Sequence, residues 1–177
     1  MKEALFYLIT LLFFSSCDPS QPRSPISNNS GTFIDASVKR NKQLNKFEYE
    51  KIKAFVEKST KDILSSNYGF WYYYNKKQEN NKNYPRFGDQ IQYKYDVKTL
   101  KNELIYSEEE LSIQNYFIDQ QELFSGLRHG LKLMKEGEVV TFIFPSQIAY
   151  GYYGDNNQIE RNEPIICKVT LIKHQIN

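Results

Sequence analysis

Two short stretches decide the fold: residues 126–138 read GLRHGLKLMKEGE and residues 144–151 read FPSQIAYG. The first belongs to a segment from Gln121 to Met134 whose apolar residues fall on one side of a helix, so this segment is predicted to be helical. Gly137 then ends the helical pattern. The residues from Glu138 to Phe144 predict a strand, and the proline of the second stretch closes it.

Most of the remaining pattern indicates strands. An aromatic run at residues 69–74 has high strand propensity, and apolar residues alternate with polar ones from Gln90 to Val97. Further strands are predicted at residues 103–106, 114–118 and 164–173. Helices do not alternate with these strands, which argues against a parallel, doubly wound sheet. The sequence therefore predicts an α+β fold, in which an antiparallel sheet carries a single helix across one face.

The composition excludes several classes of protein. The chain has 177 residues, of which 40% are hydrophobic, and a net charge of +2. It can therefore fill one sizeable core, which intrinsically disordered chains cannot do. No dense block of Lys and Arg offers a face for nucleic acid. Two Cys and two His are too few for a cysteine-rich zinc site or a disulfide framework, so we expect neither a metal nor another cofactor.

The N-terminus has the features of an export signal. Residues 4–14 are an apolar run interrupted by one Thr, which is too short to span a bilayer as a helix. Ser15 and Ser16 follow, immediately before Cys17, where a signal peptidase prefers small residues. Residues 1–16 resemble a bacterial lipoprotein signal, which implies that Cys17 is lipidated and anchors the protein to a membrane of the cell envelope, on the periplasmic side or at the outer membrane. The alternative is a plain cleaved signal followed by an incidental cysteine.

Three segments are expected after the signal. Residues 17–45 are predicted to be a flexible tether, because the stretch after Cys17 is rich in Pro, Ser and Asn and lacks apolar periodicity. Residues 46–68 are predicted to be an amphipathic helix, which either packs beside its own domain or mediates a partner contact. Residues 69–177 are left for the folded domain.

The two opening stretches resemble the FKBP-type peptidyl-prolyl cis/trans isomerases. In that family a helix reading G-W-x-x-G-L-x-x-M-x-x-G-E leads to a strand and then to a P-x-x-x-A-Y-G turn. Residues 87–93 are similar to its K-x-G-D-x-V-x-V-x-Y segment, and residues 159–171 to its I-P-P-x-x-x-L-x-F-x-V-x-L ending. The resemblance covers residues 69–174 and implies an FKBP-like sheet wrapped on one helix. Together with the lipoprotein start, it is strongest to the gliding-motility-associated FKBP-like lipoproteins of flavobacteria.

The resemblance implies a set of site residues. Tyr150 matches the tyrosine whose hydroxyl reaches a carbonyl of the bound peptide, and Tyr93 matches an aromatic residue of the pocket wall. Leu123 and Phe124 match the aliphatic pair before the helix glycine, and Ile159 matches an apolar residue of the flap.

Other positions depart from the family pattern. Leu127 replaces the Trp that normally forms the pocket floor, and Cys167 replaces a Phe at its base. Tyr106 stands where the family has the Asp of its F-D-S segment, and Glu160-Arg161 replaces Pro-Pro. These substitutions alter a substrate-binding pocket that is expected to remain apolar on one side.

Two functions follow from the resemblance. The first is an isomerase that acts on proline-containing segments of exported proteins and assists their folding. The second is an FKBP-like binding module with weak or no turnover in a motility or secretion assembly. The Leu at position 127 favours the second function, whereas the intact Ala149-Tyr150-Gly151 turn favours the first.

Overall fold

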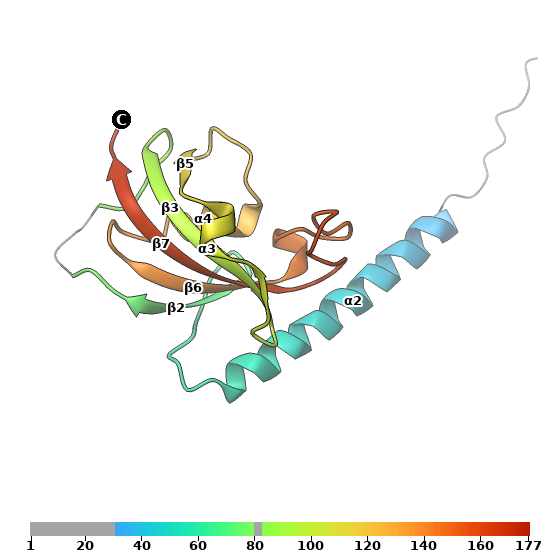
Figure 1. The fold of residues 1–177 in the computed structure, drawn as a ribbon. Helices are drawn as coiled ribbons and strands as arrows, with labels where there is room; N and C mark the ends of the chain where they lie inside the picture. The colour runs from blue at the N-terminus through green and yellow to red at the C-terminus, as the bar shows by residue number, and fades with distance from the viewer. Residues whose placement is uncertain (1–30, 80–82) are drawn as a thin grey trace, which may run out of the picture. The chain divides into compact units, whose positions relative to one another are not determined.

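The computed structural model describes residues 31–79 and 83–177 (Figure 1). The predicted export signal, Cys17 and the first part of the predicted tether lie outside these described residues. The elements in chain order are α2 (Gly31–Lys58), β1 (Leu64–Ser65), β2 (Trp71–Lys76), β3 (Gln90–Thr99), β4 (Leu104–Tyr106), α3 (Glu108–Leu111), β5 (Gln114–Phe117), α4 (Ser125–Leu131), β6 (Val139–Phe144), the 3₁₀ helix η1 (Ser146–Ile148) and β7 (Ile165–Gln175).

The strands form one antiparallel sheet in the order β1-β2-β6-β7-β3-β4, and β5 pairs with β3 outside this path. The predicted strands agree with β2 to β7 to within two residues at each end, and the predicted antiparallel α+β architecture is confirmed. The longest pairing joins β3 to β7, which run side by side from Gln90 opposite Gln175 to Thr99 opposite Ile165.

The two faces of the sheet bury different clusters. Side chains alternate between faces along a strand, and the register of β6 on β7 sets Phe142 opposite Cys167 and Ile143 opposite Ile166. Phe142 and Cys167 belong to the main core, which includes Leu127 of α4. Ile143 and Ile166 belong to a second, smaller cluster on the other face. We call these the inner and the outer face.

Helix α4 is shorter than the predicted segment from Gln121 to Met134. Phe124 precedes it in an extended conformation, with φ −60° and ψ 142°. At the other end, the N–H of Met134 bonds to the carbonyl of Leu131, an i to i−3 bond that tightens the chain into a turn. The apolar residues of the predicted segment still face the core, although only its middle part is helical.

Helix α2 begins at Gly31 and ends at Lys58, whereas the sequence predicted a helix over residues 46–68 after a tether that reached residue 45. Residues 31–45 have no continuous apolar stripe that would predict a helix, and the structure continues the helix through them, with Asn45 hydrogen-bonded to Gln147. After Lys58 the chain leaves the helix, and Leu64 and Ser65 pair with β2 instead of continuing it. No helix within the described residues is long and apolar enough to cross a membrane.

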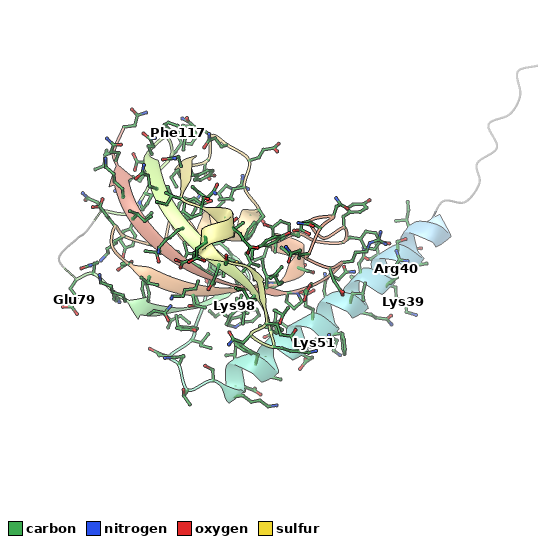
Figure 2. The ribbon with its side chains drawn as sticks, in the orientation of Figure 1. Lys39, Arg40, Lys51, Glu79, Lys98 and Phe117 are labelled. Atoms are coloured by element: carbon green, nitrogen blue, oxygen red, sulfur yellow. The ribbon has the colours of Figure 1, made fainter. Side chains whose placement is uncertain are left out.

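Helix α2 packs on the outer face of the sheet. Ile52 is fully buried against Ile143 and Ile166, and the partly buried side chains that join this cluster are Phe55, Val56, Ile63, Trp71 and Leu100. The helix also carries exposed charged side chains, among them Lys39, Arg40 and Lys51 (Figure 2). Of the two predicted roles, the structure shows packing beside its own domain, in a compact unit that runs from Val38 to Asn177.

The contact between α2 and the sheet predicts a large loss of stability for Ile52→Ala. Because Ile52 is 0% exposed, the substitution should lower the free energy of unfolding by about 2–5 kcal/mol, measured by urea denaturation. Val38→Ala is the control, since Val38 is 46% exposed on the same helix and its loss should change stability by less than about 0.5 kcal/mol. Equal effects of the two substitutions would contradict this packing.

Candidate active site

All eight residues predicted to form the site lie in one region of the inner face. Four are members of the buried core cluster there and four are partly buried side chains that pack against it. They are Tyr93, Leu127, Ile159 and Cys167 in the core, and Tyr106, Leu123, Phe124 and Tyr150 at its edge. The structure therefore brings the predicted residues together, although they come from β3, β4, α4, β7 and two loops.

Tyr150 and Phe124 form the aromatic edge of the site. Tyr150 follows η1, and its ring centroid lies 5.2 Å from that of Phe124. The backbone at Phe124 is extended, and the centroid of its ring also lies 5.4 Å from the centroid of the Phe144 ring. Leu123, the preceding residue, packs against the same cluster. A half-buried tyrosine hydroxyl thus stands beside an apolar wall.

The floor of the site is closed by small and medium side chains. Leu127 and Cys167 are both 0% exposed, so neighbouring side chains cover the two positions where the resemblance implies a Trp and a Phe. Helix α4 lies close to the sheet here, because a Cβ at Gly126 would come within 2.6 Å of the Phe144 ring. Cys167 is a buried thiol whose pKa is raised by burial, so it contributes apolar volume and not a nucleophile.

Tyr95 is a site residue that the sequence reasoning missed. It lies on the same face of β3 as Tyr93, with ring centroids 5.7 Å apart, and its side chain is close enough to Tyr150 for each to influence the pKa of the other. Burial and the nearby Cys167 raise the pKa of Tyr95 to about 12. Burial likewise raises the pKa of Tyr150 and of Tyr93. The alternation along β3 put both tyrosines on one face of the strand, and the family resemblance pointed to Tyr93 alone.

Asp155 is a second residue that the sequence did not reveal. The Tyr106 hydroxyl donates to Asp155 Oδ2 at 2.5 Å, and the backbone N–H groups of Asn157 and Ile159 donate to Asp155 Oδ1, both at 2.9 Å. Burial alone would raise the pKa of Asp155, but these hydrogen bonds lower it below the usual value. The carboxylate thereby ties the loop that carries Ile159 to Tyr106 at the end of β4.

The chemistry available to this site is that of an apolar surface with hydroxyl groups. Within the described residues, no group of three His, Cys, Asp or Glu side chains could hold a metal ion. The peptide bond before proline rotates over a barrier of about 18–20 kcal/mol, which comes from amide resonance. An apolar surface favours the less polar, twisted amide, and a tyrosine hydroxyl can hold a neighbouring carbonyl.

Comparison with known protein families supports the prolyl isomerase activity that the site's chemistry allows. The model of the FKBP-type peptidyl-prolyl cis-trans isomerase family matches residues 81–172, slightly more than half of the chain. No curated protein matches the sequence. The chain belongs to the FKBP-type peptidyl-prolyl cis-trans isomerases, and its reaction is therefore cis/trans isomerisation of the peptide bond that precedes proline.

Two solved structures share the fold. A peptidyl-prolyl cis-trans isomerase from Pseudomonas syringae pv. tomato matches with a TM-score of 0.61 and 18% sequence identity, over 76% of this chain and 96% of that one. FkpA from Escherichia coli matches with a TM-score of 0.57 and 18% identity, over 99% of this chain and 82% of that one. At this identity the likeness bears on the fold alone.

The position of Tyr150 predicts a modest effect of Tyr150→Phe on catalysis. The substitution removes one hydroxyl while leaving the ring against Phe124, so kcat/KM on proline tetrapeptides should fall by about two- to tenfold, which corresponds to about 0.5–1.5 kcal/mol. Tyr153→Phe is the control, because Tyr153 is 71% exposed outside the cluster and its hydroxyl should be dispensable. An unchanged kcat/KM for Tyr150→Phe would exclude a role for its hydroxyl.

The raised pKa values of the site tyrosines predict activity that does not depend on pH near neutrality. A raised pKa keeps the neutral hydroxyl form to higher pH, so Tyr93, Tyr95 and Tyr150 stay protonated well above pH 9. We therefore expect kcat/KM to be constant from about pH 6 to pH 9. A loss of activity with a midpoint below pH 9 that disappears in Tyr150→Phe would show that Tyr150 ionises in this range.

Proposed function

We propose that this isomerase acts on proline-containing segments of exported proteins and that a lipid on Cys17 holds it at a membrane of the cell envelope. The observation that carries the catalytic part is the Tyr150 hydroxyl beside the apolar floor of Leu127 and Cys167. The apolar run at residues 4–14, with Ser15-Ser16 before Cys17, supports the anchor and the compartment.

The apolar surface and the Tyr150 hydroxyl would contact different parts of the substrate. The prolyl ring would rest on the apolar surface formed by Phe124, Ile159 and the residues beneath them, where water is scarce. The Tyr150 hydroxyl would hold the carbonyl next to the rotating bond, and the ring of Phe124 beside it keeps the Tyr150 ring in place. Each tenfold increase in rate requires the site to favour the twisted amide by only about 1.4 kcal/mol. Apolar contacts and one hydrogen bond can supply this preference without a nucleophile or a metal.

The anchor leaves room for the enzyme to meet its substrates. Acyl chains bind a protein to the surface of a bilayer without crossing it. The residues between Cys17 and Gly31 are rich in Pro, Ser and Asn, a composition that acts as an extended spacer. The resemblance to gliding-motility-associated lipoproteins supports a motility or secretion assembly as the set of client proteins that this isomerase serves.

A second candidate function is an FKBP-like binding module with weak turnover. The observation that favours it is the complete burial of Leu127, because a floor closed by its neighbours offers less contact to a bound proline than a tryptophan would. Such a module would hold a proline-containing or apolar segment of a partner without rotating it.

The anchor predicts a specific effect of Cys17→Ser in cells. The variant should lose labelling by a fatty-acid analogue and should move from the membrane to the soluble fraction, since serine cannot carry the thioether-linked lipid. Cys167→Ala is the control, because Cys167 is buried and its loss should leave both labelling and fractionation unchanged. A Cys17→Ser protein that stays labelled and membrane-bound would contradict the lipoprotein assignment.

A further inference from the structure

Ser146 fixes the backbone of the turn formed by Ala149, Tyr150 and Gly151, which we call the Tyr150 turn. It begins η1 and is 3% exposed. Its carbonyl accepts hydrogen bonds from the N–H of Ala149 at 2.9 Å and from the N–H of Gly151 at 2.8 Å. These two residues flank Tyr150 on either side. A shift of Ser146 would therefore move the backbone from which the Tyr150 hydroxyl is presented.

Helix α2 holds Ser146 through Glu48. The Ser146 hydroxyl donates to Glu48 Oε2 at 2.7 Å, and the Ser146 N–H donates to Glu48 Oε1. Glu48 is only 6% exposed, and within the described part of the chain it forms no ion pair with Lys, Arg or His. A buried carboxylate that no cation neutralises depends on such charge-assisted hydrogen bonds, so the link is directional and fixes Ser146 against the helix.

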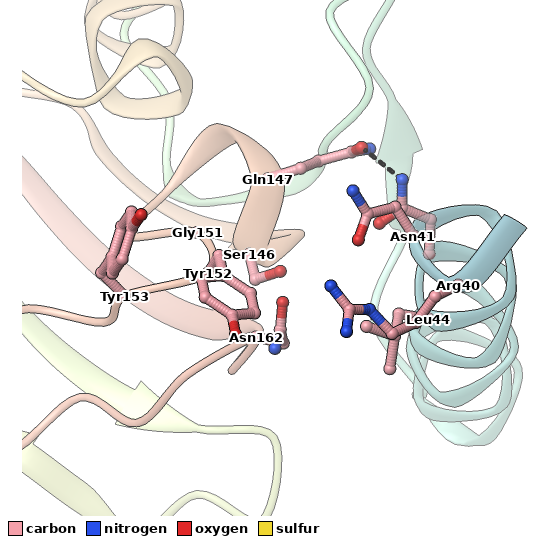
Figure 3. Close-up of a pocket in the computed structure, with 10 residues that line it drawn as sticks. Arg40, Asn41, Leu44, Ser146, Gln147, Gly151, Tyr152, Tyr153 and Asn162 are labelled. Carbon is pink, nitrogen blue, oxygen red and sulfur yellow. Dashed lines mark hydrogen bonds between the residues drawn. The ribbon is translucent and has the colours of Figure 1, made fainter. Parts of the chain in front are cut away.

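The helix and the turn are joined by polar links and not by close packing. A cavity of about 430 Å³ separates Arg40, Asn41 and Leu44 of α2 from Tyr152 and Tyr153 (Figure 3). Apolar packing cannot set the turn where this cavity lies. Figure 3 shows Ser146 and Gln147 extending from the turn toward α2, and the Asn45 amide donates to Gln147 Oε1 at 3.1 Å, one helical turn before Glu48.

We propose that Glu48 is a positioning residue of the isomerase. It acts from α2 through Ser146, whose carbonyl holds the two peptide groups on either side of Tyr150, and so sets where the Tyr150 hydroxyl meets the substrate carbonyl. This inference rests on the role of Tyr150 in the proposed function. It also makes α2, which lies outside the part of the chain matched by the family, a component of the active site.

A double-mutant cycle tests this role. Glu48→Ala should lower kcat/KM by roughly three- to thirtyfold, because a small displacement of a positioned group is costly. Tyr150→Phe removes the group that Glu48 positions, so adding Glu48→Ala to Tyr150→Phe should cost less than about threefold more. Glu48→Gln should keep most of the activity, since its amide oxygen can accept from the Ser146 N–H and its NH₂ can donate to the Ser146 hydroxyl.

The controls separate positioning from stability. Glu50→Ala removes an exposed carboxylate of the same helix and should leave kcat/KM unchanged. Where Glu48→Ala fails to fold, Ser146→Ala takes its place in the cycle, because it removes one of the two hydrogen bonds to Glu48. The positioning role would be overturned if Glu48→Ala lowered kcat/KM by the same factor in the wild-type and Tyr150→Phe backgrounds. It would also be overturned if Glu48→Ala lowered the melting temperature but left kcat/KM unchanged. A Tyr150→Phe variant as active as the wild type would instead reject the role of Tyr150 on which the inference rests.

Discussion

The antiparallel register of β6 on β7 places apolar side chains on both faces of the sheet at the same point along the strands. Phe142 opposite Cys167 faces α4, and one residue further along Ile143 opposite Ile166 faces α2. A slip of one residue would exchange the two faces. The floor of the candidate active site and the surface on which α2 packs therefore depend on the same strand pairing.

This pairing also brings the two helices to the same loop. Strand β6 ends at Phe144, and the chain turns at once into η1 and the Tyr150 turn. The ring of Phe144 supports Phe124 from the inner side, while Glu48 of α2 holds Ser146 from the other side. The turn that presents Tyr150 is thus fixed from both faces, which suits a catalyst that works by holding an apolar surface and a hydroxyl in place.

The sequence correctly predicted the elements in which apolar residues recur at a regular local spacing. The alternation along β3 and β7 located both strands, and the motif around Tyr150 named residues that the structure brings together in one cluster. The start of α2 was missed because residues 31–45 have no continuous apolar stripe to mark a helix. Tyr95 was missed because it shares a face with Tyr93. Glu48 and Asp155 act through hydrogen bonds to residues 98 and 49 positions away, and no local pattern reports such a contact.

The central claim is that an apolar surface with one positioned tyrosine hydroxyl turns the bond before proline. A protease-coupled assay of the purified chain on tetrapeptides that differ in the residue before proline tests it most directly. We predict an acceleration proportional to the protein concentration, with Leu or Phe before proline favoured over Glu, because the surface is apolar. An isomerisation rate equal to the uncatalysed rate for every peptide would contradict the claim and would leave the binding module as the function of this fold.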